Sequence, residues 1–194
     1  MVTPEQVLDF WFGDGRSARF SLWFEKNDET DRTLRERFGD AVERAARGEL
    51  DAWEAQGPRG RLALVVLLDQ FTRNIHRGSP RMFENDERAR AIARRALAAG
   101  DDAGFGPFEA AFLYLPLEHS ESLPDQEESV RRFEALHARA PEAHREVTAS
   151  FLDYARRHEE PIRRFGRFPH RNALLGRETT PEEAEFLKQP GTSF

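Results

Sequence analysis

The segment LALVVLL at residues 62–68 places apolar side chains on every side of a helix. A helix that is apolar all round has to be buried against neighbours on all of its faces. We therefore predict a central helix over residues 58–76, with the other elements packed around it.

Helix-start signals occur near both ends of the chain. Thr3-Pro4 and Thr180-Pro181 each combine an N-cap hydroxyl with a proline at the first helical position. Gln or Glu follows three residues after each threonine, which completes a capping box. Between these signals apolar residues recur at helical spacing, and strands have no comparable signal. We expect helices over residues 4–12, 29–48, 58–76, 80–99, 107–121, 125–139, 141–160 and 181–188.

The expected helices and their short connections favour an all-α fold. Turn residues such as Gly57-Pro58 and Gly100 separate successive helices. Connections this short make neighbouring helices antiparallel. At 194 residues the chain fits one core. We predict a single helical domain over residues 1–194, built from stacked antiparallel helix pairs.

Charge and composition exclude several classes of partner. The formal net charge of −6 disfavours nucleic acid and anionic membranes as partners. No stretch approaches the roughly 20 apolar residues that a membrane span needs, and the first residues lack the basic leader of a signal peptide. We therefore expect a cytoplasmic protein. A chain without Cys forms neither disulfides nor thiolate metal sites.

Two of the most apolar segments run directly into polar clusters. LALVVLL is followed by DQFTRNIHRG at residues 69–78, and FLYLPL is followed by EHSE at residues 118–121. A third polar cluster, RFGRFPHRN, lies at residues 164–172. If the helices alternate in direction, the three helices that lead to these clusters run parallel and end at the same edge of the domain. We expect the three clusters to meet there.

Such a meeting of clusters would form a charged pocket. Helix C-termini carry partial negative charge and favour arginines nearby. Arginine holds a carboxylate or a phosphate at two points, and a carboxylate beside a histidine can move a proton. We take as candidates for acid–base catalysis His119, His170, Asp69 and Glu121. We take as candidates for binding a small anionic ligand Arg73, Asn74, Arg77, Glu118, Arg167, Arg171 and Asn172.

The same residues allow two other interpretations. In the first, Asp69 and Glu121 pair with arginines and lock the C-terminal loop in place without any ligand. An Asp69–Arg73 pair is natural in either case, because residues four apart share a helix face. In the second, the chain is a protein-interaction scaffold with a groove between helices. Whether the chain is an enzyme stays open at this point.

Cofactors are not expected from the sequence. Possible metal donors are present, but no pair among them has the HExxH or ExxH spacing of known metal sites. The arginines around them would also repel a cation. The chain has no GxGxxG and no Walker loop for a nucleotide. We therefore predict neither a metal site nor another cofactor.

Taken together, these motifs resemble a bacterial family, the domain of unknown function number 924. The resemblance implies stacked antiparallel helix pairs related in fold to tetratricopeptide repeats, and it implies no activity or catalytic residue. The matching stretches, which span nearly the whole chain in order, are VLDFWFG (7–13), LLDQFTRNIHRG (67–78), residues 83–89 with Asp86, FLYLPLEHSE (112–121), RFGRFPHRN (164–172), Leu175-Gly176-Arg177, TPEEAEFL (180–187) and Ser193-Phe194.

Overall fold

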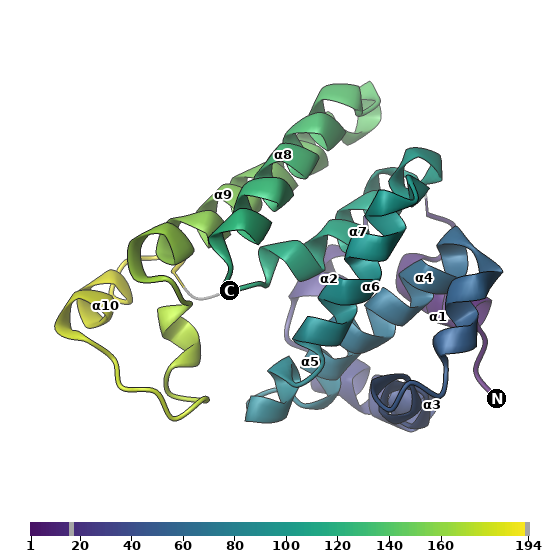
Figure 1. Ribbon diagram of the computed structural model, residues 1–194, viewed down its shortest axis with the longest axis horizontal. Coiled ribbons are helices and arrows are strands. Elements are labelled where there is room, and N and C mark those ends of the chain that lie inside the picture. The colour runs from purple at the N-terminus through teal and green to yellow at the C-terminus, as the bar shows by residue number, and fades with distance from the viewer. Residues whose placement is uncertain (16–17, 193–194) are drawn as a thin grey trace. The chain divides into compact units, whose positions relative to one another are not determined.

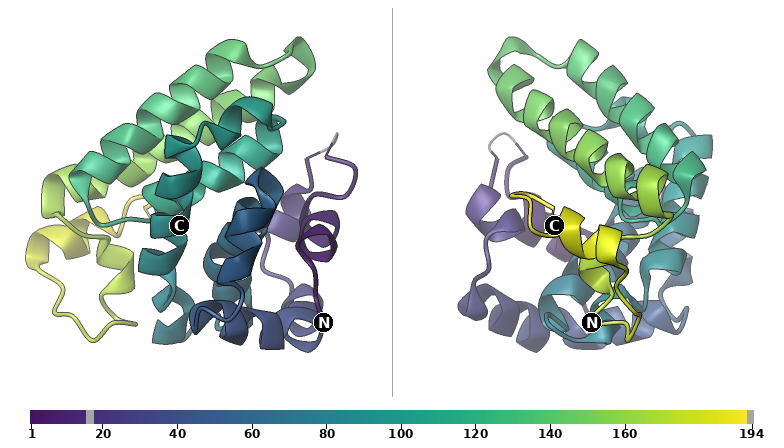
Figure 2. Two further views of the ribbon diagram at one scale, coloured as in Figure 1. Left: turned by 45° about the vertical axis from the view of Figure 1, so that its right-hand side comes forward. Right: turned by 90° about the vertical axis from the view of Figure 1, so that its left-hand side faces the viewer.

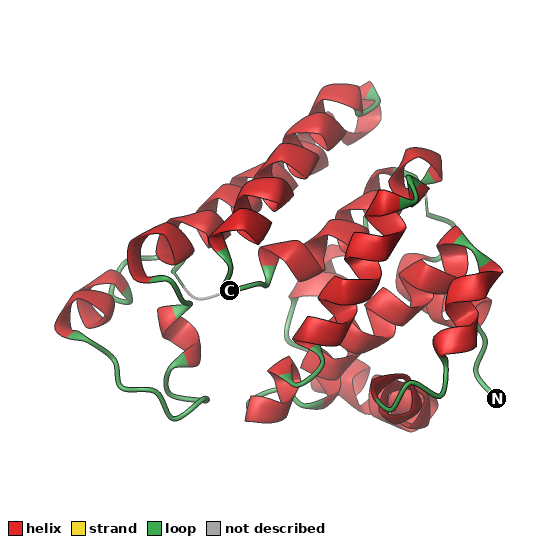
Figure 3. Cartoon of the chain, in the orientation of Figure 1, coloured by secondary structure: helices red, strands yellow, loops and turns green. Residues whose placement is uncertain are grey.

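Helices make up the regular structure of the protein (Figure 3). The computed structural model describes residues 1–15 and 18–192, and no strand occurs within them. Ser193 and Phe194 of the motifs above lie outside the described residues. The predicted all-α fold is confirmed. No helix within the described ranges has both the length and the apolar character needed to cross a lipid bilayer.

The described chain forms two compact units, residues 1–116 and 117–194. The predicted single domain over residues 1–194 stays a prediction, because compactness does not show whether the units unfold separately.

The α-helices of the first unit (Figure 1) are α1 (Pro4–Phe12), α2 (Phe20–Phe24), α3 (Asp28–Ala46), α4 (Pro58–Val65), α5 (Thr72–Ile75), α6 (Asp86–Ala98) and α7 (Pro107–Glu118). The last two residues of α7 belong to the second unit.

The predicted central helix of the first unit is confirmed. Helix α4, a π-helical turn (Val66–Phe71) and α5 follow one another without a break from Pro58 to Ile75. All side chains of residues 62–68 are fully buried. Helix α4 packs against α1 and α6, and the π turn packs against α3. The π turn, which the sequence pattern did not predict, adds a residue to one turn, and such turns are frequent at functional sites.

Gly60 brings α4 close to the 3-10 turn Asp51–Gln56. A Cβ atom at Gly60 would stand 2.0 Å from the carbonyl oxygen of Trp53. Real Cβ atoms do not approach a backbone oxygen that closely. The absence of a side chain at Gly60 therefore allows α4 to pack closely against this turn.

The second unit contains a pair of long helices. Helices α8 (Leu123–Arg139) and α9 (Arg145–Phe165) lie side by side in Figure 1 and in both views of Figure 2. The rings of Phe133 and Phe151 meet between them, with centroids 6.3 Å apart. A loop with a 3-10 turn (Pro169–Arg171) leads from α9 to the short helix α10 (Pro181–Phe186). The α8–α9 pair is antiparallel, as the short connection predicted.

Helix ends follow local capping. Both predicted capping boxes form, at Thr3 and at Thr180. Helix α9 begins at Arg145 instead of residue 141, because Pro141 is itself extended and a 3-10 turn (Glu142–His144) follows it. It continues to Phe165 and ends at Gly166, whose φ of 70° is typical of a helix C-terminus.

Two further helices differ from the prediction. The expected helix 107–121 ends at Glu118, so residues 119–121 lie in the turn that follows. The expected helix 80–99 is divided into a 3-10 turn (Pro80–Phe83) and α6. Helix α2 was not predicted, because its five residues are too few for a periodic pattern.

Candidate functional site

Asp69 lies within the π turn of the first unit and is fully buried. Gln70 donates a hydrogen bond from Nε2 to Asp69 Oδ2 at 2.5 Å. Arg73 Nη2 lies 3.5 Å from Asp69 Oδ1 and donates to Asp86 Oδ1 at 2.8 Å. The expected Asp69–Arg73 pair thus forms, and the shorter bond of the arginine goes to α6. Two carboxylates share the charge of one guanidinium.

Asn74 and Arg77 contact a carboxylate that the sequence pattern did not single out. Asn74 Nδ2 donates to Asp31 Oδ1 at 3.0 Å, and Arg77 Nε donates to Asp31 Oδ2 at 2.7 Å. Asp31 is buried on α3. These bonds tie the end of α5 to α3, and they fit the lock interpretation better than the pocket interpretation.

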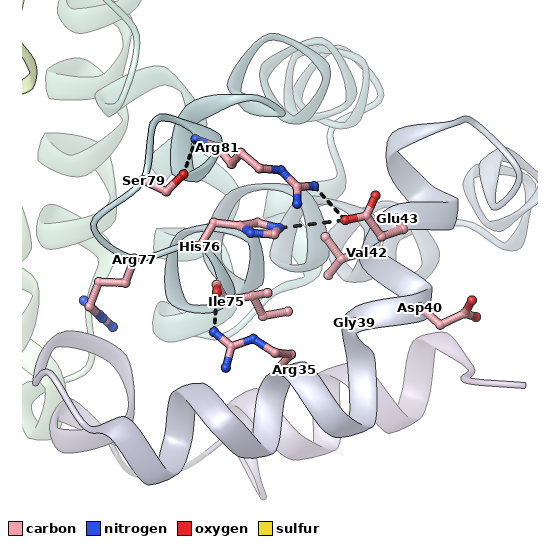
Figure 4. Close-up of a pocket in the computed structure, with 10 residues that line it drawn as sticks. All are labelled: Arg35, Gly39, Asp40, Val42, Glu43, Ile75, His76, Arg77, Ser79 and Arg81. Atoms are coloured by element: carbon pink, nitrogen blue, oxygen red, sulfur yellow. Dashed lines mark hydrogen bonds and ion pairs between the residues drawn. The ribbon is translucent and has the colours of Figure 1, made fainter. Parts of the chain in front are cut away.

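The first unit has a surface hollow of about 580 Å³ beside these residues (Figure 4). His76 stands in its middle, and Arg77 points away from it. Arg81 donates to Glu43 Oε1 at 2.8 Å and to Glu84 Oε1 at 2.9 Å. An anion that entered the hollow would have to compete with both carboxylates for Arg81. The hollow is therefore a weak candidate for anion binding.

The second unit brings a carboxylate and a histidine together at low exposure. Glu118 Oε1 lies 3.2 Å from His158 Nδ1, and the two residues are 3% and 5% exposed. The same Nδ1 lies 2.9 Å from the carbonyl oxygen of Tyr154. Because a carbonyl oxygen can only accept, Nδ1 carries the hydrogen when the ring is neutral. The lone pair of the neutral ring is then on Nε2.

Basic side chains surround His158. Its pKa is well below the ordinary value, because burial and the neighbouring His119, Arg171 and His170 all disfavour a second proton, while the bond to Tyr154 acts in the opposite direction. His158 is therefore neutral at pH 7.

The ring of His158 lies close to those of His119 and Phe168, and the ring of His170 lies on Phe168 as well. The ring centroids of His119 and His158 are 6.1 Å apart, and those of Phe168 and His170 are 5.5 Å apart. The guanidinium carbon of Arg171 lies 4.3 Å from the centroid of Phe168, and Arg171 Nη2 donates to the carbonyl oxygen of His119 at 3.0 Å. We define the His158 cluster as Glu118, His119, His158, His170 and Arg171.

Glu121 holds the loop that carries His170 and Arg171. Its Oε1 accepts from the backbone N–H of Phe168 at 2.8 Å, and its Oε2 accepts from Arg177 Nη1 at 2.8 Å. Burial alone would raise the pKa of Glu121, but Arg177 and the Phe168 amide lower it overall. This places Glu121 in a supporting contact; its predicted catalytic role stays a prediction.

Arg167 and Asn172 meet at another buried carboxylate, Glu183. Arg167 donates from Nε and Nη2 to the two oxygens of Glu183 at 2.6 and 2.8 Å, and Asn172 Nδ2 donates at 3.2 Å. The pKa of Glu183 is lowered to about 2, mainly by the hydrogen bond from Arg167. This two-point pair ties the loop to α10 as a lock.

The candidate residues thus fall into groups within each unit. In the first unit Asp69 pairs with Arg73, and Asn74 and Arg77 both donate hydrogen bonds to Asp31. In the second unit the His158 cluster collects four candidates together with His158 itself, which the sequence analysis did not include. The expected meeting of all three polar clusters involves residues of both units and stays a prediction.

His158 left a signal in the sequence that would have identified it. Phe151, Ala155 and Ile162 form the buried stripe of α9, and His158 lies on the same stripe at helical spacing. A titratable residue within an apolar stripe needs a polar partner inside the fold. The candidates came from the three polar clusters, and His158 lies just before the third of them.

Comparisons with known proteins agree with the fold. The sequence model of a bacterial protein family of unknown function, DUF924, matches residues 7–191. The solved structure of the protein of unknown function ATU0120 from Agrobacterium tumefaciens is similar, with a TM-score of 0.81 and 37% sequence identity over 95% of this chain and 96% of that chain. A comparison with curated proteins gave no match.

Proposed function

The chain belongs to the bacterial family of unknown function DUF924, and we propose that its His158 cluster binds a small anionic ligand, a carboxylate or a phosphate. The observation that carries this proposal is the gathering of basic side chains around His158. The ring of His119 lies 6.1 Å from that of His158, and Arg171 bonds the backbone of His119. An anion placed among them would be stabilised by the charge of Arg171 and by hydrogen bonds from the imidazoles.

Arg171 is the residue best placed to hold the anion. Its guanidinium is buried on the face of Phe168, and the backbone of His119 fixes one of its nitrogens. A guanidinium that is already oriented loses little conformational freedom on binding.

His119 or His170 would act as the acid or base if the bound ligand reacts. Both side chains are half-buried, whereas His158 is buried beside Glu118. A half-buried imidazole can exchange protons with solvent and still contact a ligand. The class of reaction depends on the ligand, which a thermal-shift screen would identify.

Replacing Arg171 with glutamine is expected to abolish stabilisation by the anion. We propose a thermal-shift screen of carboxylates and phosphates, in which a ligand at 100 times its Kd adds about 2.7 kcal/mol. At about 2–4 °C for each kcal/mol, such a ligand raises the Tm by several degrees. Arg171→Gln should reduce this ligand-induced shift to near zero.

Arg156→Gln is the matched control for this experiment. Arg156 is exposed on α9 and pairs with Glu134 at 2.9 Å, so the substitution removes the same charge away from the cluster. The control should keep the full shift. The proposal fails if no anion in a broad screen stabilises the chain, or if both variants respond to the ligand equally.

A protein-interaction scaffold is the second candidate. Phe20 and Phe24 on α2 are 43% and 53% exposed, and their rings are 5.9 Å apart. Exposed aromatic pairs of this kind are common in protein-binding surfaces. Replacing both with serine should abolish binding of a protein partner and leave the anion-induced shift unchanged. Retained partner binding in this variant would count against the scaffold.

A further inference from the structure

We propose that Glu118, His119 and His158 form a binding site for a divalent transition-metal cation of the Zn²⁺ type. The inference goes beyond the proposed function, because a metal site needs no anionic ligand. One ligand atom from each of the three residues can be chosen so that all three lie within 4.8 Å of one another. The sequence spacing had predicted no metal here.

The spacing is close to that of a metal centre. Nitrogen and oxygen ligands about 2.0–2.2 Å from zinc lie about 3.3–3.6 Å from one another in a tetrahedron. The three donor atoms are at most 4.8 Å apart, so side-chain movements on the order of 1 Å would suffice. Three protein ligands also leave the fourth position open for water or for an anion.

His158 is held in the form that a metal needs. A ligating imidazole is neutral, and its second nitrogen usually donates to a backbone carbonyl or a carboxylate. Nδ1 of His158 lies 2.9 Å from the carbonyl oxygen of Tyr154. This contact and Glu118 Oε1, which lies 3.2 Å from the same nitrogen, orient the ring. A metal would bind at the other nitrogen, Nε2, and Glu118 would turn toward it.

The donor set selects the class of metal. Two imidazoles and one carboxylate suit Zn²⁺ and its transition-metal neighbours, whereas Mg²⁺ and Ca²⁺ prefer oxygen ligands only. Arg171 lies near enough to affect His158 electrostatically and opposes the binding of a cation. An anion in the open position would offset that charge. Metal and anion should therefore each increase the affinity of the site for the other.

A second group of donors with similar spacing provides the contrast. Glu43, His76 and Glu84 also bring their ligand atoms within 4.8 Å of one another. Arg81, however, donates to both of these carboxylates at 2.8 and 2.9 Å. A metal there would have to displace the guanidinium, and we expect no binding at this group.

The test is a titration of the untagged full-length chain with ZnCl2 after removal of metal with EDTA. Isothermal calorimetry should show one Zn²⁺ for each chain, and MgCl2 should give no signal. His119→Gln and His158→Gln should each weaken Zn²⁺ binding at least 10-fold, whereas His76→Gln should leave it unchanged. Co²⁺ in place of Zn²⁺ should give the visible absorption of a four-coordinate site, and His119→Gln should remove that absorption.

Circular dichroism shows whether each variant folds. If His158→Gln does not fold, His119→Gln decides the result, because His119 is only half-buried. The proposal is overturned if the parent chain binds no Zn²⁺ at millimolar concentration, or if His76→Gln weakens binding as much as His119→Gln does. Repeating the anion screen in EDTA separates the two proposals. Anion stabilisation without Zn²⁺ binding would leave the proposed function standing and remove only the metal.

Discussion

Replacing Arg167 with alanine is expected to lower the free energy of unfolding, because removing one partner of an ion pair leaves the charge of the other unpaired. Glu183 is 2% exposed, and both of its oxygens accept hydrogen bonds from Arg167 at 2.6 and 2.8 Å. The variant leaves that carboxylate buried without its guanidinium. Urea unfolding followed by far-ultraviolet circular dichroism measures the loss.

Arg163→Ala is the control for Arg167→Ala. Arg163 also pairs with glutamates, Glu159 and Glu127, but its side chain is 54% exposed. Exposed pairs contribute little to stability, so the free energy of unfolding of this variant should stay close to that of the parent chain. Similar losses in the two variants would contradict the assignment of Arg167 and Glu183 as a buried lock.

The same ion pair makes the stability of the chain depend on pH. The pKa of Glu183 is lowered to about 2 from an ordinary value of 4.5. A depressed carboxyl pKa contributes stability that is fully present above the unfolded-state value and is lost as the pH falls through the folded-state value. The parent chain should therefore lose stability from about pH 4.5 toward pH 2, and Arg167→Ala should show a shallower loss over this range.

The unfolding curves of the parent chain also test the predicted single domain. All three tryptophans, Trp11, Trp23 and Trp53, lie in the first unit. Tryptophan fluorescence therefore follows that unit, whereas circular dichroism follows the helices of both. Coincident transitions would support one cooperative domain. Separate transitions would show that the two units unfold independently.

The features of the fold that could be predicted from the sequence are those that depend only on residues close together in the chain. The capping residues at Thr3 and Thr180 and the all-apolar run at residues 62–68 act within one or two helical turns, so their meaning does not depend on the rest of the chain. The π turn is different. Thr72 N–H bonds the carbonyl oxygen of Leu67, and Asn85 Nδ2 donates to the hydroxyl of Thr72. Asn85 lies outside this helix, and the spacing of apolar residues within the helix does not indicate such a contact.

The same distinction holds for the candidate site. Asp69 and Arg73 could be paired from their spacing of four residues, because a helix places such residues on one face. The partners Asp31, Asp86 and Glu183 are separated from their arginines by 46, 13 and 16 residues. Pairing over such separations is decided by how helices pack. The sequence therefore indicated which arginines to consider, but not which carboxylate each arginine binds.

Replacing Phe71 with alanine is the second change from which we expect a large loss, about 3–5 kcal/mol. Phe71 is the last residue of the π turn and is fully buried. Its ring centroid lies 5.0 Å from that of Phe38 on α3 and 5.3 Å from that of Trp11 on α1. The π turn thus directs Phe71 into an aromatic cluster that joins three elements, and truncation would open a cavity among them.

Tryptophan fluorescence makes this prediction simple to measure, because Trp11, Trp23 and Trp53 all lie in the first unit. Urea unfolding followed by tryptophan fluorescence gives the free energy of the first unit. Phe24→Ala removes the same side chain from a position that is 53% exposed, so it should lower that free energy by about 1 kcal/mol or less. If Phe71→Ala were as mild as Phe24→Ala, the cluster around the π turn could not be a packed core. A large loss confined to Phe71→Ala would show that this ring is packed in the core of the first unit.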